Sequence, residues 1–190
     1  PNGSTVPSAT YVLPMPAGYT NSNAKINYVR TWEPWKPITD ASTVPSLDVA
    51  DCKQTTAYVD GQGRVIQTVS KKISPQSKDM VAYSTYDQYG REVVKYLSYV
   101  SADNSGSFKA NPFSEQQSYY STGSLNNNQY TGEQVYYSRT AFEAAPLGRV
   151  DSSLAPGNSW GGGNRGIRTQ YLINTATDSV RLWTIADPAG

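Results

Sequence analysis

A short motif occurs twice in the sequence, and its spacing limits the possible folds more than any other feature. Residues 58–64 read YVDGQGR and residues 86–91 read YDQYGR, so Tyr, Asp, Gly and Arg recur at nearly the same intervals. The aspartate can cap a turn with its side chain, and glycine adopts the left-handed conformation that other residues avoid. Flanking β-branched and aromatic residues favour strands. The motif therefore predicts a β-hairpin whose loop of about four residues is a type I turn closed by a glycine bulge.

A third, more degenerate copy lies in residues 142–157, FEAAPLGRVDSSLAPG. It keeps an aromatic residue, an acid and a Gly-Arg pair, but two more residues separate the acid from the glycine. The first copy also departs from the pattern, because Val59 stands between the tyrosine and the aspartate. The motif residues of the three copies are Tyr58, Asp60, Gly63 and Arg64; Tyr86, Asp87, Gly90 and Arg91; and Phe142, Glu143, Gly148 and Arg149.

The rest of the chain alternates strand and turn signals, so we expect an all-β fold of antiparallel hairpins, arranged as a sheet, a partial shell or a sandwich, with little helix. Strands are expected at 55–59, 64–73, 81–86, 91–100, 115–121, 133–142, 149–154, 167–174 and 179–185. Only 44–51 and 112–120 could hold a turn or two of helix. In the second of these, Asn111 can cap a helix that begins at Pro112 and has Glu115 near its start, as an alternative to the strand at 115–121.

Two regions follow from the composition along the chain. Residues 1–25 are rich in Pro, Gly, Ser and Asn, which predicts an extended lead-in or linker that packs by anchors such as Tyr11, Leu13 and Met15. Residues 26–190 form the β domain. We expect this domain to be truncated at its C-terminal end, because the family resemblance described below implies a further hairpin strand after VRLWTI. An edge strand would then be unpaired or supplied by a partner.

The composition excludes several classes of function. Of the 190 residues, 37% are hydrophobic and fifteen are tyrosine, which is enough for one sizeable, aromatic core. The net charge is only +1, so we expect no binding of nucleic acid or of anionic membranes. No apolar run is long enough to insert into a membrane. A surface of uncharged polar residues is typical of secreted and surface-displayed β proteins.

The reactive residue types are scarce as well. The chain has no histidine, which excludes catalytic triads and every site with a histidine ligand, and its one cysteine, Cys52, excludes an internal disulfide. Residues 161–166, GGGNRG, match a phosphate-binding pattern, but the strand that follows offers no helix N-terminus, which favours a plain loop. Residues 103–106, DNSG, lack the spaced acids of a calcium loop. We therefore expect no catalytic residue, no metal and no cofactor.

The hairpin motifs resemble the YD repeats of bacterial RHS proteins, in which Tyr-Asp, two variable residues and Gly-Arg precede an outgoing strand. A collinear string over residues 26–185 also resembles the module that precedes the main repeat array in large secreted RHS proteins. The string comprises NYVRTWEPWKPITD, QTTAYVDGQGRVIQTV, NPFSEQQSYYS, APLGRV, APGNSWGGGNRG and TQYLINTATDSVRLW.

The resemblance implies a structural role. In RHS proteins the repeats wind into a β shell that encloses a C-terminal domain, often a toxin, and the preceding modules cap or plug the shell or join it to delivery parts. The implied location is secreted or on the bacterial cell surface. The implied partners are other segments of the same large protein or a secretion partner, and the expected activity is docking rather than catalysis.

For Arg64, Arg91 and Arg149 we expect guanidinium groups that stack on neighbouring rings and bond the carbonyls of the next turn.

The alternative to a docking function is that of a carbohydrate-binding module, in which exposed rings stack on sugars. Its candidates are Trp32, Trp35, Trp160 and Trp183, together with the pairs Tyr119-Tyr120 and Tyr136-Tyr137. Because neighbouring strand residues point to opposite faces, one tyrosine of each pair should be buried and the other exposed.

Overall fold

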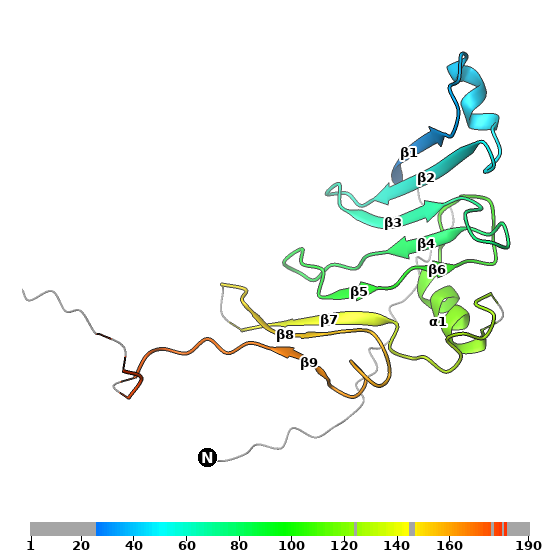
Figure 1. Ribbon diagram of the computed structural model, residues 1–190. Helices are drawn as coiled ribbons and strands as arrows, with labels where there is room; N and C mark the ends of the chain where they lie inside the picture. Colours follow the sequence, from blue (N-terminus) through cyan, green and yellow to red (C-terminus); the bar gives the residue numbers. More distant parts are fainter. Residues whose placement is uncertain (1–25, 124, 145–146, 176, 180, 182–190) are drawn as a thin grey trace, which may run out of the picture.

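The structure is a computed structural model, and it describes residues 26–123, 125–144, 147–175, 177–179 and 181. The predicted lead-in, residues 1–25, lies outside this part, as does Trp183. The predicted all-β fold of antiparallel strands with little helix is confirmed. Figure 1 shows the strands stacked one beside the next, with β1 and β9 at opposite ends of the stack.

The described strands form two sheets, in the orders β1-β2-β3-β4-β6 and β5-β7-β8-β9. Their bounds are β1 Asn27–Pro34, β2 Cys52–Val59, β3 Val65–Ser70, β4 Met80–Tyr83, β5 Val94–Tyr96, β6 Tyr99–Val100, β7 Tyr137–Phe142, β8 Val150–Leu154 and β9 Gly166–Arg168. The second hairpin joins the sheets, because β4 belongs to one and β5 to the other, and Ser84 bridges Lys95 between them. Stacked hairpins thus run through both sheets.

The helical segments differ from the expected ones in their residue bounds and in the interactions that cap them. The strand predicted at 115–121 is wrong, and α1 (Pro112–Thr122) takes its place and ends at Gly123, whose φ is 72°. The Asn111 side chain makes no capping hydrogen bond; its backbone carbonyl accepts from the Glu115 N–H. The helix expected at 44–51 is a 3-10 helix, η1 (Ala41–Ser46), which starts earlier because the Asp40 side chain accepts from the Ser42 N–H.

Several strand bounds also differ. The strand expected at 91–100 is divided into β5 and β6, and those expected at 133–142 and 167–174 are the shorter β7 and β9. Most of the strand expected at 179–185 lies outside the described residues. Alternation of residue types along a sequence does not show where a strand stops pairing with its neighbour.

The core is aromatic, in agreement with the fifteen tyrosines. One cluster of buried residues comprises Tyr58, Val69, Val81, Tyr83, Tyr99, Phe113 and Tyr120, and a smaller one comprises Val94, Val135 and Tyr137. Tyr83 is central, since its ring stacks on Tyr96 at 4.6 Å and meets Phe113 of α1 edge-on at 4.8 Å. Buried Gln116 of α1 accepts from the Tyr83 hydroxyl and donates to the Leu97 carbonyl. The helix is thus attached to the sheets by rings and by buried hydrogen bonds.

A buried ion pair holds the segment between β6 and α1 onto the sheet. The Lys109 ammonium group lies 2.7 Å from Asp79, and both side chains are almost wholly buried, at 3% and 0% exposed. Asp79 also accepts from the backbone N–H groups of Lys72 and Gly106. Burial alone would lower the pKa of Lys109, but the hydrogen bonds that its ammonium group donates to Asp103 and Asp79 outweigh this effect and raise the pKa.

We predict that Lys109→Met lowers the free energy of unfolding by about 3–5 kcal/mol, because it leaves the Asp79 carboxylate buried without a counter-charge. Urea unfolding followed by fluorescence measures this change. The control is Lys53→Met, which breaks the exposed ion pair with Glu33 and should cost less than about 1 kcal/mol. Equal effects of the two substitutions would contradict the structural role of Asp79.

Candidate functional site

The turn of the second hairpin shows how the motif residues act together. The Asp87 N–H donates to the Arg91 carbonyl at 2.9 Å, and the Gly90 N–H donates to the Asp87 carbonyl at 2.9 Å. The Asp87 carboxylate accepts from the backbone N–H groups of Tyr89 and Arg91. Gly90 has a φ of 76°, in the left-handed region. The loop is therefore closed by its acid and its glycine, with the arginine as the first residue of the outgoing chain.

The first hairpin repeats this turn, and the third adapts it. Asp60 accepts from the N–H groups of Gln62 and Arg64, and Gly63 has a φ of 79°. In both the first and third hairpins the strand register shifts beside the turn, at Tyr58/Val59 and at Ala141/Phe142. In the third, the Glu143 N–H still donates to the Arg149 carbonyl at 2.9 Å, across a longer loop. Two turns of equal length and one longer turn thus each place an acid and an arginine side by side.

Each arginine is fixed by the acid of its own turn. Arg64 Nε lies 2.8 Å from Asp60, Arg91 Nε lies 2.8 Å from Asp87, and Arg149 binds Glu143 through two nitrogens, both at 2.8 Å. Such paired hydrogen bonds orient the planar guanidinium group as well as holding it. Among the described residues, none of the expected bonds from these arginines to carbonyls of the next turn is formed, and each guanidinium group binds the acid of its own turn instead.

The ion pairs lower the pKa of all three acids. Backbone and side-chain hydrogen bonds from Arg64 hold the pKa of Asp60 below its usual value. Burial alone would raise the pKa of Asp87, but the hydrogen bonds from Arg91 and from the Tyr89 N–H outweigh it and lower the pKa. The hydrogen bond from the Arg149 side chain lowers the pKa of Glu143. All three carboxylates are therefore charged at neutral pH and act as fixed partners of the arginines.

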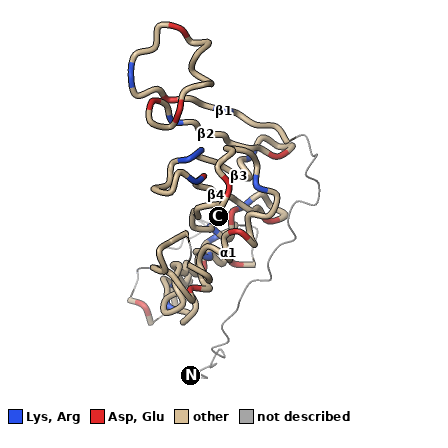
Figure 2. Tube along the Cα trace, turned by 90° about the vertical axis from the view of Figure 1, so that its right-hand side faces the viewer, with Lys and Arg blue, Asp and Glu red and all other residues tan. Residues whose placement is uncertain are grey.

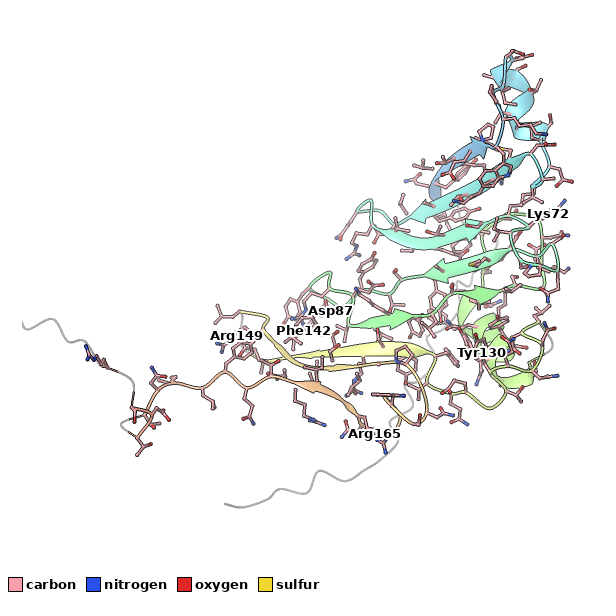
Figure 3. The ribbon with its side chains drawn as sticks, in the orientation of Figure 1. Lys72, Asp87, Tyr130, Phe142, Arg149 and Arg165 are labelled. Carbon is pink, nitrogen blue, oxygen red and sulfur yellow. The ribbon has the colours of Figure 1, made fainter. Side chains whose placement is uncertain are left out.

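The guanidinium groups held in this way contact the next hairpin. Arg64 lies over the Tyr86 ring at 4.5 Å, Arg91 over the Phe142 ring at 4.3 Å, and Arg149 over the Tyr171 ring at 4.3 Å. In Figure 3, Asp87, Phe142 and Arg149 lie close together at the turn ends of the hairpins. We call this series of contacts the arginine–aromatic ladder. Each contact joins neighbouring hairpins, as the sequence predicts for the stacking of arginine on rings.

The turn glycines also make room for the ladder. A Cβ atom on Gly90 would lie 3.2 Å from a terminal nitrogen of Arg64, and one on Gly148 would lie 3.6 Å from a terminal nitrogen of Arg91. Both glycines adopt the positive φ of their own turn, and at Gly90 the missing side chain also leaves room for the guanidinium group of the preceding hairpin, whereas 3.6 Å at Gly148 is an ordinary contact distance.

The two ends of the ladder differ. At the first hairpin, Val59 stands where later copies have Tyr86 and Phe142, and among the described residues no arginine stacks there. Tyr58 instead packs edge-on against Phe108 at 5.1 Å in the core. At the other end the ring is Tyr171, which follows β9 and which the sequence motif does not mark, since no Asp-x-x-Gly-Arg follows it. Its signal was its place in the expected strand 167–174, one hairpin after Arg149.

The end of the ladder lies beside an exposed sheet edge. β9 pairs with β8 on one side and is the outermost described strand of its sheet. The apolar side chains on and after β9 face solvent: Ile167 is 74% exposed, Leu172 is 83% and Ile173 is 91%. A backbone edge, a row of apolar side chains and the last ring of the ladder are therefore all available in one short segment.

Among the described residues, the tryptophans proposed for sugar stacking do not form one platform. Trp32 lies on β1 and is half-buried, and Trp35, just beyond β1, is exposed and donates from its ring N–H to the Val49 carbonyl. Trp160 is exposed in the loop between β8 and β9, at the other end of the stack (Figure 1). Tyr119 and Tyr120 are helical rather than in a strand, and the Tyr136 ring stacks on Tyr120 at 4.9 Å, so both members of each pair contact other rings.

The remaining motifs are structural. The glycines of 161–166 allow close backbone contact, since a Cβ on Gly161 would lie 2.4 Å from the Ala155 carbonyl oxygen and one on Gly166 2.4 Å from that of Ser153. Among the described residues, no group of three possible metal-binding side chains occurs, and no helix is long and apolar enough to cross a membrane. Figure 2 shows acidic and basic residues interspersed along the chain trace.

Comparison with known proteins gives one match. A family model described as "Domain of unknown function (DUF6443)" matches residues 30–173. The matched range contains all three turns and Tyr171, so it includes the whole described ladder. No curated protein and no solved structure matches the chain.

We predict that Arg91 and Phe142 stabilise the fold cooperatively. In a double-mutant cycle with Arg91→Ala and Phe142→Leu, the coupling in unfolding free energy should be about 0.5–2 kcal/mol, as for a partly desolvated cation–π pair. The control cycle combines Arg64→Ala with Phe142→Leu, which are not a stacked pair, and should give coupling near zero. A coupling as small as that of the control cycle would show that the contact between Arg91 and Phe142 does not stabilise the fold.

The lowered pKa values also predict a pH dependence. A carboxyl whose pKa is lowered by folding adds stability above its unfolded value near 3.8, and this stability is lost as the pH falls through the folded pKa. Asp87→Asn should therefore destabilise the protein at pH 7, and its difference from the native chain should shrink below about pH 4. Urea midpoints measured from pH 7 to pH 2 test this. A difference that stays constant with pH would exclude the ion pair as its cause.

Proposed function

The chain belongs to the family described as domain of unknown function DUF6443, and on that premise we propose that it is a non-enzymatic docking module of a large secreted protein similar to the RHS proteins. Its role is to join one β unit to the next, either within the same long chain or with a partner at the bacterial surface. The proposal places it outside the cell, in a surface or toxin-delivery protein. The observation that carries it is the exposed β9 edge at the end of the arginine–aromatic ladder.

The ladder supports docking because it is already a way of joining hairpins. At each described junction, an arginine fixed by its own acid covers a ring of the following hairpin. Neither hairpin needs a separate core for this contact, so the stack can be extended by further units. A neighbouring strand that pairs with β9 would meet its outer backbone edge and the exposed apolar side chains of Ile167 and Leu172.

The hydrogen-bonding pattern identifies the groups available on β9. The Thr169 N–H donates to the Asp151 carbonyl of β8, and Ser153 lies opposite Ile167. Because successive residues of a strand point their N–H groups to opposite sides, those of Arg168 and Gln170 face away from β8. These groups can bind an added strand, as in β-augmentation. The exposed side chains of Ile167 and Leu172 would be covered in the process.

An exposed apolar edge of this kind favours association with another strand over a monomeric state in solution. Strands at the edges of soluble proteins are commonly protected by charges, prolines or bulges, and an unprotected apolar edge pairs readily with another chain. Here the segment 167–173, IRTQYLI, has one charged residue, Arg168. Sugar binding has less support, because Trp32 and Trp35 lie at one end of the stack and Trp160 at the other.

We predict that the chain self-associates through β9 when no other partner is present. Sedimentation velocity and light scattering over a range of concentrations should show association, and Arg168→Pro should reduce it at least tenfold, because proline removes an outward N–H while the bonds to β8 remain. Arg168→Ala is the matched control: it removes the charge, keeps the N–H and should associate like the native chain.

The same experiment discriminates the competing function. If the native chain is monomeric throughout and its tryptophan emission shifts on addition of one polysaccharide from a bacterial and plant panel, the docking proposal is wrong and a carbohydrate-binding module is the better description. Association that Arg168→Pro leaves unchanged would exclude the β9 edge.

A further inference from the structure

A pocket of about 500 Å³ lies where α1, the β4 and β6 strands and the loops around β7 and β8 meet. Its wall is aromatic and apolar, with tyrosines 119, 120 and 130, Met80, Leu97 and Pro156 among the lining residues. Figure 3 places Tyr130 beside α1, on the side of the molecule away from the ladder's turns. The pocket therefore lies on the side of the molecule opposite the ladder's turns.

The tyrosine rings of the pocket are held in place from behind. The Tyr120 ring stacks on Tyr136 at 4.9 Å with an interplanar angle of 10°, and its hydroxyl donates to the Ser98 carbonyl. Tyr119 meets Tyr120 edge-on at 5.0 Å, and Tyr130 lies 5.7 Å from Tyr120. The rings thus form fixed ridges rather than mobile side chains.

Two hydroxyl groups of the pocket have no hydrogen bond to a described residue, those of Tyr119 and Tyr130. Burial raises the pKa of Tyr119, and the neighbouring Tyr130 adds to the effect, so its phenol is a neutral donor at ordinary pH. The one charged lining residue, Glu133, already accepts from the N–H groups of Asn158 and Val135. The pocket therefore offers apolar ridges and hydroxyl donors, without a charge aimed at a ligand.

These properties suit an extended, proline-containing peptide. A polyproline II segment has no internal hydrogen bonds, so its carbonyl groups can accept from tyrosine hydroxyls while its proline rings lie between aromatic ridges. A sugar site would need several polar side chains that converge on the ligand's hydroxyls. Residues 12–16 of the same chain read VLPMP, with two prolines and three apolar residues and no charge.

We propose that residues 12–16 of this chain occupy the tyrosine pocket. These residues lie outside the described part of the structure, which begins at Ile26. Ile26 itself packs against the core cluster that contains the pocket residue Tyr120. The connection from residue 16 to residue 26 spans up to about 33 Å when extended.

The distance to be covered is shorter than that reach. From β1 to β6 there are four strand spacings of about 4.8 Å, or about 19 Å across the sheet. Met80 of the pocket is in register with Thr31 through the intervening strands, about four residues or 13 Å along the sheet from Asn27. The two components combine to about 23 Å, which the connection can span without strain.

Disulfide trapping in the full chain tests the proposal, in a background in which the native Cys52 is replaced by alanine. The pair Met15→Cys with Leu97→Cys joins the segment to the pocket wall. The matched control pair is Met15→Cys with Ile38→Cys, since Ile38 beyond β1 is an apolar residue of similar exposure, 37% against 41% for Leu97. We expect the pocket pair to oxidise at least tenfold faster than the control pair.

Two further measurements complete the test. Replacement of Pro14 and Pro16 by glycine in the pocket pair should slow its oxidation at least fivefold, whereas Pro7→Gly should not, with circular dichroism to show that the fold is kept. A synthetic peptide of residues 10–18 in excess should compete and slow oxidation. Equal rates for the two cysteine pairs would overturn the proposal. An oxidation rate of the pocket pair that does not change when Pro14 and Pro16 are replaced would also overturn it. If the synthetic peptide still bound in that case, the pocket would be a site for a separate partner.

Discussion

The structure depends on one interaction, the pairing of an arginine with the acid that caps its own turn. A guanidinium group on a flexible side chain has many conformations, and its stacking on a ring would be weak if each contact had to immobilise it. The turn removes this cost, because Asp60, Asp87 and Glu143 hold their arginines while they also accept backbone N–H groups. The arginine thus reaches the next hairpin already oriented. Turn chemistry, ion pair and stacking are therefore parts of a single arrangement.

The rest of the fold covers the ends of the hairpins that the ladder does not reach. The ladder joins the hairpins at their turn ends, whereas the other ends are covered by α1 and by the segment that Lys109 ties to Asp79. There the sheet buries aromatic rings and a few polar groups that are fully hydrogen-bonded, such as Gln67, which binds both the carbonyl and the N–H of Lys109. The protein is repetitive along one side and irregular along the other. The exposed β9 edge belongs to the repetitive side.

The sequence predicts the local features well and the long-range ones poorly. The hairpin turns, the antiparallel class and the stacking of arginines on rings follow from residues that are neighbours in the sequence, such as Asp87, Gly90 and Arg91. The helix α1 was mistaken for a strand in one of two alternatives, because its tyrosines have high strand propensity and its amphipathic pattern is weak. Tyr171 is not marked by the motif, because no Asp-x-x-Gly-Arg follows it as it does Tyr86. The buried Lys109–Asp79 pair and the tyrosine pocket likewise depend on contacts between distant segments, which no motif marks.

The ladder has a direction, and this bears on how the module can be joined to others. In each described contact the arginine belongs to the earlier hairpin and the ring to the later one. At the first turn Val59 takes the place of the ring, so a preceding hairpin of the same kind would find no aromatic partner there. At the other end Tyr171 already receives Arg149, and β9, which this ring follows, is the outermost described strand of its sheet. No Asp-x-x-Gly-Arg turn follows Tyr171 in the sequence, so the described ladder ends at this ring, and a strand added beyond β9 would be held by backbone hydrogen bonds and apolar contacts instead.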